Sequence, residues 1–458
     1  MYILQQLLFL KRRSAMEIRK QYIELLRELI AIPSVSAKEA YLPEAAHLIA
    51  DAFRGLGADV IYDDTYFAPF VLATFQSKVP NAKQLVIYNH YDVQPAEPLD
   101  LWATDAWTLT EKNGKLYGRG VDDDKGNLTA RLSAIAEYLT EHNNQLPINI
   151  TFIVEGSEET SSRHLDDYLA KHHHHLSADL VIWESGGKNV NEEIEIFGGN
   201  KGIVTFDMTA KTANNDLHSS LSAIVDSASL RLSQAIASLF DHHGNIAVPH
   251  FYDDIAIPNA REKQLVAALP LTRDSLITQH GIKVPLYTDR NGDDLKETLY
   301  FKPTINIEGI QSGYNSAGVK TVLPATATAK AEARLVPNMD PDVTLQRIKD
   351  HLQEQGLSDI VVTKTLGQPG YRSDMSDSEI LRVIDITAHY YKAQPIVIPT
   401  SPGTGPMFYI HEALQAPIAS LGIGYSHALD HAPNENIRLT DYNQHIDVIK
   451  ELIRSYEL

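Results

Sequence analysis

Hydrophobic and polar residues follow two different repeats along the chain, and each repeat predicts a type of element. Apolar residues recur at helical spacing from Glu17 to Ala31, and Pro33 ends that pattern. Apolar runs such as 85–89 and 148–155 are typical of buried strands. Further helices are expected at 41–56, 127–140 and 162–171, and further strands around Ile61, at 70–75 and at 179–184. Strands that alternate with helices predict an α/β sheet, in which ligands bind beyond the carboxyl ends of the strands.

The pattern changes after Gly202. A strand, a helix, two strands, a helix and a strand are expected in turn at 203–212, 225–240, 304–310, 322–335, 341–355 and 360–366. This βαββαβ order predicts a domain of ferredoxin-like type, inserted into the first domain. Residues 241–302 contain acidic residues and prolines, and we expect an irregular insertion there. After Arg372 the first pattern returns, with a helix near 378–391, strands at Ile396 and Ile418, and a helix at 440–456.

The predicted fold class is therefore α/β. We expect an outer domain with a mixed, mostly parallel sheet flanked by helices, and an inserted α+β domain of ferredoxin-like type. The expected boundaries are 16–200 for the first part of the outer domain, 201–370 for the inserted domain and 371–458 for the second part of the outer domain.

Residues 1–15 fall outside both patterns. Their apolar patch precedes Lys11, Arg12 and Arg13, which reverses the charge order of a signal peptide. We interpret this segment as a dispensable N-terminal extension, with Met16 as a possible start.

Composition narrows the possible partners. The 458 residues include 59 acidic and 40 basic ones, a formal charge of -19, which argues against a nucleic-acid or anionic-membrane partner. No apolar run approaches the roughly 20 residues of a membrane span. Cysteine is absent, so disulfides and thiolate ligands are impossible and any zinc must be held by His and carboxylates. A reducing cytoplasm is compatible with this, and we expect a cytoplasmic protein.

The run LVIYNHYDVQP at 85–95 is the first candidate for metal chemistry. Alternate side chains of a strand share a face, so His90 and Asp92 are expected to project together at the end of the strand. A neutral imidazole binds a metal through one nitrogen, and Asp92 could accept a hydrogen bond from the other. An isolated pair of this kind is more typical of a polar surface turn, so the interpretation depends on further ligands.

Four further places supply candidate ligands at expected strand ends or turns. Three adjacent carboxylates, 122–124, would repel one another without a cation, although Asp122 and Asp124 are also compatible with solvation. Glu158 and Glu159 point differently, so one can bind a metal while the other stays free. Glu184 ends a strand, and the loop near the C-terminus offers His431, with His427 as a competing candidate.

These ligands suffice for two metal ions if one carboxylate bridges them. The set is His90, Asp123, Glu159, Glu184 and His431, with Asp123 as the bridge. Imidazole and carboxylate ligands suit zinc, with manganese or cobalt compatible. Two ions would activate a bridging water and polarise a carbonyl, and Glu158 would transfer the proton. The reaction class implied is amide hydrolysis without a covalent intermediate.

The chain resembles the dinuclear zinc peptidase superfamily of carnosinases, glutamate carboxypeptidases, aminoacylases and succinyl-diaminopimelate desuccinylases. The motifs that carry the resemblance are HYDVQP (90–95), GRGVDDDKG (118–126), EGSEE (155–159), DLHSS (216–220), ARLVPNM (333–339) and HAPNE (431–435). The runs LYGRG, GVKTVLP and RLVPNM are most similar to the carnosinase-like dipeptidase branch. The resemblance implies a catalytic outer domain and an inserted lid and dimerisation domain, hence a homodimer.

The resemblance also implies roles for single residues. His90 and Glu184 would bind one metal and Glu159 and His431 the other, with Asp123 bridging, Asp92 orienting His90, and Glu158 as general base. His218 would reach the oxyanion in the partner's site, Arg334 would bind the substrate's terminal carboxylate, and the loop with Gly403, Thr404 and Gly405 would place donors near it. By composition alone, His218 and Arg334 would be a surface histidine and a strand-edge arginine.

The expected substrates are dipeptides or small peptides with a free C-terminal carboxylate. Glu184 stands where carnosinase-like members often have Asp and deacylases often have Glu, so an N-acyl amino acid amidohydrolase with the same mechanism is the alternative. A non-catalytic relative would lack some of these residues. Here the five metal ligands, the orienting Asp92 and the general base Glu158 are all present. Phosphoester hydrolysis is disfavoured because no basic phosphate clamp accompanies the ligands.

Overall fold

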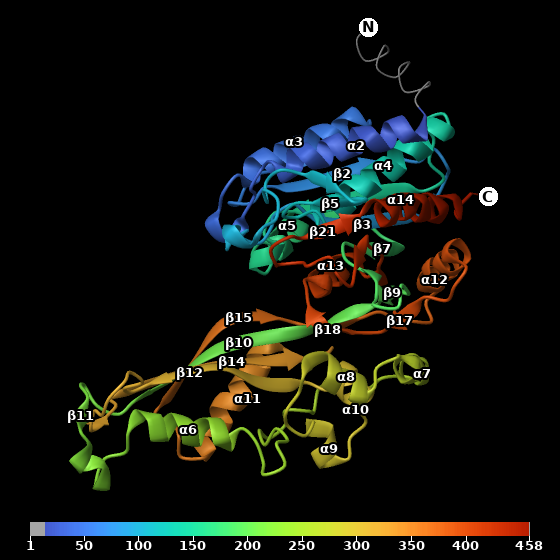
Figure 1. Cartoon of the computed structure of the whole chain (residues 1–458). Coiled ribbons are helices and arrows are strands. Elements are labelled where there is room, and N and C mark those ends of the chain that lie inside the picture. The colour runs from blue at the N-terminus through green and yellow to red at the C-terminus, as the bar shows by residue number, and fades with distance from the viewer. Residues whose placement is uncertain (1–13, 458) are drawn as a thin grey trace. The chain divides into compact units, whose positions relative to one another are not determined.

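The computed structural model describes residues 14–457 and divides the chain into two compact units (Figure 1). The described parts of Met1–Gly198, Ser373–Pro399 and Tyr409–Leu458 form the first unit. Gly199–Arg372 and Thr400–Phe408 form the second, so residues 400–408 belong with the inserted part of the chain. Most of the predicted extension 1–15 lies outside the described residues. Ser14 caps the first described helix in a reciprocal capping box with Glu17.

The first unit is built on a six-stranded sheet with the order β1-β2-β6-β3-β7-β19. The strands are β1 (Asp59–Asp63), β2 (Phe70–Phe75), β6 (Asn149–Glu155), β3 (Gln84–His90), β7 (Leu180–Trp183) and β19 (Ile418–Ser420). β6, β3, β7 and β19 are mutually parallel, whereas β1 and β2 are antiparallel. The four parallel strands therefore end at one edge of the sheet, where His90 pairs in register with Glu155. The predicted mixed, mostly parallel sheet is confirmed.

Helices flank this sheet. They are α2 (Ala15–Ile30), α3 (Leu42–Gly55), α4 (Lys125–Glu141), α5 (Leu165–His172), α12 (Ser378–Tyr391) and α14 (Leu439–Arg454), and the first unit also contains α13 (Met407–Leu414) from Tyr409 onward. α4 is buried from Lys125 to Tyr138 because it packs on β3 and against both α2 and α14. Two small sheets complete the unit: β4 (Thr110–Lys112), β5 (Lys115–Tyr117) and β21 (Asn436–Arg438), and β17 (Ile396–Ile398), β9 (Ile194–Phe197), β8 (Gly187–Lys188) and β20 (Gly424–Tyr425).

The second unit has an antiparallel sheet with the order β12-β14-β10-β15. The elements are β10 (Gly199–Lys211), α6 (Ala228–Ser238), β12 (Thr304–Ser312), β14 (Thr326–Leu335), α11 (Pro341–Glu354) and β15 (Ile360–Gln368). Alternate residues of β10, including Phe206 and Met208, form the core with alanines of β14 and with α6 and α11. The predicted βαββαβ order is confirmed.

Two expectations for this unit were wrong. Residues 241–302 are not irregular throughout, because four short helices occur there: α7 (Ala260–Ala268), α8 (Arg273–His280), α9 (Tyr287–Asn291) and α10 (Leu295–Phe301). Side-chain caps such as Asn259 stabilise them, and few of their residues are buried, so no apolar repeat marked them. The expected strand 322–335 is split at Pro324, which lacks a main-chain N–H, and β13 (Val322–Leu323) pairs instead with β11 (Leu217–His218).

No helix among residues 14–457 is long and apolar enough to span a bilayer.

Candidate metal centre

The chain brings the predicted ligands to the carboxyl edge of the parallel strands. His90 is the last residue of β3, and Glu184 directly follows β7. Asp123 lies in the turn between β5 and α4, Glu159 lies in a short 3-10 helix after β6, and His431 lies in the loop before β21. All five belong to the first unit, which therefore contains the complete predicted ligand set.

The Asp123 carboxylate lies between the two imidazoles. Its Oδ1 is 2.9 Å from His90 Nε2, and its Oδ2 is 2.8 Å from His431 Nε2. His431 Nε2 is also 3.2 Å from Glu159 Oε2. One oxygen of the Asp123 carboxylate thus lies beside each imidazole.

Two groups of side chains could each hold a metal ion. His90, Asp124 and Glu184 form one, and Asp123, Glu159 and His431 form the other, with the ligand atoms of each group within 4.8 Å of one another. Glu184 Oε2 and Asp124 Oδ1 are buried and have no hydrogen-bond partner among the described residues. Unsatisfied buried carboxylate oxygens are costly without a cation, so the donor set fits a divalent metal of zinc type.

Asp122 and Asp124 are both buried, at 6% and 0% exposure, which contradicts the alternative that they are solvated. The Oδ2 atom of Asp124 accepts hydrogen bonds from Asn89 Nδ2 at 2.6 Å and from the His90 N–H at 3.1 Å. Asp124 thereby contacts the strand that ends in His90, and it is an additional candidate ligand.

The pKa values of Glu158 and Glu184 reflect their burial among other carboxylates. Burial raises the pKa of Glu158 well above its usual value; His90 opposes the shift, and neighbouring carboxylates reinforce it. The pKa of Glu184 is raised for the same reasons. Protonation is one way to relieve such crowding, and a bound cation is the other.

The pKa values of the two imidazoles are also raised, but here hydrogen bonds to carboxylates are the cause. Burial alone would lower the pKa of His90, but hydrogen bonds with Asp123 and Asp92 raise it well above its usual value. Hydrogen bonds to Asp123 and Glu159 raise the pKa of His431 to about 11. A metal binds the neutral imidazole, so metal binding here would replace these protons.

Asp92 contacts His90 and also the turn that carries the two glutamates. His90 Nδ1 lies 3.1 Å from the main-chain oxygen of Asp92 and 3.3 Å from its Oδ1. The Asp92 carboxylate accepts the N–H groups of Glu158 at 3.1 Å and Glu159 at 3.0 Å. The contact with His90 was expected, whereas the contact with the glutamate turn was not.

Two further residues around the ligands were missed from the sequence. Gln94 donates to Glu159 from its N–H at 3.1 Å and from Nε2 at 2.8 Å. Arg131 of α4 is fully buried and binds main-chain carbonyls at three strand ends. Its partners are the oxygens of Tyr88 (3.0 Å), Trp183 (2.7 Å), Glu184 (3.0 Å) and Leu421 (2.8 Å). A charged residue within an apolar helical repeat was the only signal for Arg131.

The predicted substrate residues lie in the second unit. Arg334 donates a hydrogen bond from Nη1 to Thr404 Oγ1 at 2.6 Å and another from Nε to Glu332 Oε1 at 3.2 Å. Gly403 and Thr404 are in β18 (Ser401–Thr404), which pairs with β10, and Gly405 follows the strand. His218 is not among these contacts; it is exposed on β11, with Nδ1 2.9 Å from Ser220 Oγ.

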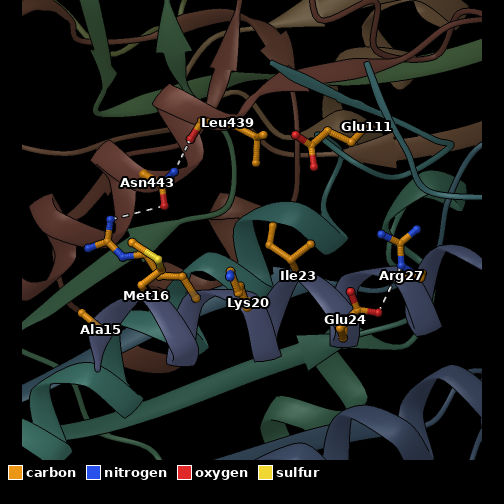
Figure 2. A pocket seen from close by; sticks show the side chains of 10 residues that line it. Ala15, Met16, Lys20, Ile23, Glu24, Arg27, Glu111, Leu439 and Asn443 are labelled. Carbon is orange, nitrogen blue, oxygen red and sulfur yellow. Dashed lines mark hydrogen bonds and ion pairs between the residues drawn. The ribbon is translucent and has the colours of Figure 1, made fainter. Parts of the chain in front are cut away.

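A separate hollow of about 790 Å³ lies between α2 and the start of α14 (Figure 2). It does not include the candidate ligands. Its lining mixes charged and apolar side chains: Ala15, Met16, Arg19, Lys20, Ile23, Glu24, Arg27, Glu111, Leu439 and Asn443.

The sequence matches the profile of Peptidase family M20/M25/M40 over residues 86–455, which includes every predicted site residue. A Beta-Ala-His dipeptidase from Mus musculus is 28% identical over 449 residues, covering 93% of this chain and 90% of that protein. A Cys-Gly metallodipeptidase from Schizosaccharomyces pombe is 30% identical over 354 residues, covering 73% of each.

Solved structures agree with the sequence matches. An M20 family metallo-carboxypeptidase from Sulfolobus solfataricus is similar with a TM-score of 0.87 and 32% identity, covering 95% of this chain and 99% of that chain. Human carnosine dipeptidase 1 is similar with a TM-score of 0.71 and 25% identity, covering 96% and 98%. The fold and the ligand cluster define a metal-dependent peptidase. The chain belongs to Peptidase family M20/M25/M40, and the proteins it is similar to include dipeptidases and a metallo-carboxypeptidase.

Proposed function

We propose that the protein hydrolyses the amide bond of dipeptides or small peptides with a free C-terminal carboxylate. The observation that carries the proposal is the Asp123 carboxylate shared between His90 and His431. Glu159 and Glu184 complete the two ligand groups, and zinc is the metal we propose, with manganese and cobalt compatible. The similarity to dipeptidases and to a carboxypeptidase supports the substrate class.

Two divalent ions, when bound, would lower the pKa of the attacking water and polarise the scissile carbonyl. Glu158 would accept the proton of that water and deliver it to the leaving amine. Its main-chain N–H is fixed by Asp92, its side chain is not needed in either ligand group, and burial raises its pKa, as suits a general base. Arg334, with Thr404 and the adjacent glycines, would bind the terminal carboxylate through a planar guanidinium.

The mechanism predicts that Glu158→Gln loses activity without losing metal. We expect kcat to fall by about 100-fold or more, because a general base typically contributes 10²–10⁴ in rate. Metal analysis of the purified variant should still find two ions per chain, and its fold should be unchanged by circular dichroism. Substantial residual turnover with both ions bound would show that another group transfers the proton.

The second candidate function is an N-acyl amino acid amidohydrolase. It is supported by Glu184, because deacylases often have Glu at this position, where carnosinase-like members often have Asp. A panel of dipeptides, N-acetyl and N-succinyl amino acids, assayed on metal-stripped protein reconstituted with zinc, manganese or cobalt, separates the two. We expect kcat/KM to be highest for dipeptides with a free carboxylate and to fall when that carboxylate is amidated. A preference for acylated amino acids would replace the first proposal by the second.

We further propose a homodimer through the inserted unit, acting in the cytoplasm. Large apolar side chains are exposed near His218, including Ile224 at 80% and Val319 at 93%. Exposed apolar groups of this kind often mark an interaction surface. His218 would then serve the active site of the partner subunit.

A further inference from the structure

Glu435 is a buried carboxylate whose side-chain hydrogen-bond partners are all donors. It lies four residues after His431, at the end of the HAPNE motif, and has no exposed surface. Its Oε1 accepts from the N–H groups of Asp122 (2.8 Å) and Asp123 (3.1 Å), and its Oε2 accepts from the Gly120 N–H (2.8 Å) and from Arg119 Nη1 (2.7 Å). One side chain thus fixes the main chain of the turn that carries Asp123.

Arg119 connects the 119–123 turn to two further segments. Arg119, which forms the ion pair with Glu435, also donates from Nη2 to the carbonyls of Ala432 and Pro95, both at 3.3 Å. Ala432 adjoins His431, and Pro95 belongs to the run that contains His90 and Asp92. Three ligand-bearing segments therefore meet at this buried ion pair.

We propose that Glu435 is a positioning residue for the metal centre. It holds the 119–123 turn so that the Asp123 carboxylate faces both imidazoles, and it links that turn to the loop that supplies His431. The inference rests on the proposed function only in assigning Asp123 as the shared ligand. Replacement by glutamine would turn one acceptor oxygen into an NH2 group facing N–H donors, which would displace the turn.

The test is cobalt binding to metal-stripped, full-length protein. For Glu435→Gln we expect the affinity for Co²⁺, measured by competition with a chelating dye, to fall about 10–100-fold, as is typical when groups that orient metal ligands are lost. We also expect the visible absorption bands of bound cobalt to shift, because the coordination geometry changes.

Glu137→Gln is the matched control. Glu137 is equally buried and ion-paired, with Arg19 Nε at 2.7 Å and Lys450 Nζ at 2.8 Å, but it contacts no candidate ligand. This variant should lower the melting temperature while keeping the wild-type cobalt affinity and spectrum. If it weakens cobalt binding as much as Glu435→Gln does, or if Glu435→Gln binds cobalt like the wild type, the proposal is overturned.

If Glu435→Gln does not fold, a second variant, Glu435→Asp, tests the same proposal. Glu435→Asp keeps the charge but withdraws it by one methylene, so its affinity should lie between those of the wild type and the glutamine variant, and wild-type affinity and spectrum would contradict the proposal. Cobalt binding requires no substrate. A wild-type protein that binds two ions but cleaves no peptide would contradict the proposed function and leave the test of Glu435 intact.

Discussion

Asp92 contacts both sides of the candidate centre through a single buried carboxylate. Its Oδ1 is 3.3 Å from His90 Nδ1, and its two oxygens accept the N–H groups of Glu158 and Glu159. The imidazole that ends β3 and the glutamates that follow β6 are thereby fixed to one group. At the scale of the residue, the geometry of the ligands depends on such acceptors as much as on the ligands themselves.

Asp92→Asn should therefore weaken both metal binding and activity. The amide has one acceptor oxygen and one NH2 group, and the NH2 group must face an N–H donor. We expect a loss of about 10–100-fold in zinc affinity, measured by chelator competition, and a comparable loss in kcat/KM. Asp105→Asn is the control, since Asp105 also accepts a main-chain N–H, that of Trp107, but at an exposed turn. Equal effects of the two substitutions would contradict the role assigned to Asp92.

At the scale of the elements, Arg131 connects α4 to the ends of β3 and β7 and to the segment after β19. The positive charge is buried, and main-chain carbonyls supply its acceptors. His445 of α14 packs beside it, with its Nε2 3.4 Å from Arg131 Nε. Burial, reinforced by the charge of Arg131, lowers the pKa of His445 well below its usual value, so this imidazole is neutral in the folded protein.

His445 makes the stability of the first unit depend on pH. The unfolded chain binds a proton at His445 near its ordinary pKa of about 6.5, whereas the folded chain does not. Its contribution is therefore complete above about pH 6.5 and is lost as the pH falls, by up to about 1.4 kcal/mol per pH unit.

In His445→Gln, the decrease in unfolding free energy with falling pH that His445 causes should be absent. Urea unfolding of metal-free protein between pH 5 and 8 measures it, followed by tryptophan fluorescence, because Trp102, Trp107 and Trp183 all lie in the first unit. His389→Gln, at an exposed position of α12, should keep the wild-type slope. A wild-type slope in His445→Gln would show that other groups cause the pH dependence.

Long elements with a strong apolar repeat were predictable from the sequence. The bounds expected for α12 and β2 coincide with those found, because a continuous buried face determines both. The four short helices α7 to α10 were not predictable by periodicity, since few of their residues are buried. In β14, alternation continued across Pro324, and only the missing N–H of proline indicated the break.

The candidate ligands were predictable because imidazoles and carboxylates at strand ends carry a chemical signal. Arg131 carried no comparable signal, and Glu435 appeared only as the last residue of the HAPNE motif, with no role indicated. Their partners are main-chain groups or residues more than 40 positions away, as in the pairing of Glu435 with Arg119 and Gly120. Such contacts depend on the tertiary fold, so a sequence pattern of local spacing does not contain them.

At the scale of the whole molecule, the proposed homodimer can be tested through catalysis. If His218 serves the partner's site, His218→Ala and Glu158→Gln are each inactive as pure homodimers. After the two variants are mixed and exchange subunits, a hybrid dimer has one site with an intact Glu158 in one chain and an intact His218 in the other. Because random exchange makes half of the dimers hybrids and each hybrid has one intact site, we expect recovery of about a quarter of the wild-type kcat.

The exposed Val319 provides the control for this exchange. Val319→Asp places a charge among the apolar residues near His218, so it should convert the dimer to a species of one chain's mass, 51.0 kDa, in light scattering, and it should abolish recovery when present in both variants. Val190→Asp, at an exposed valine of the first unit, should leave both the mass and the recovery unchanged. Recovery that survives Val319→Asp would place the interface elsewhere.

If His218→Ala alone keeps wild-type activity, or if mixing never restores turnover in a proven dimer, His218 does not act across the interface. The reason is that the hybrid site is the only combination that unites an intact His218 with an intact Glu158.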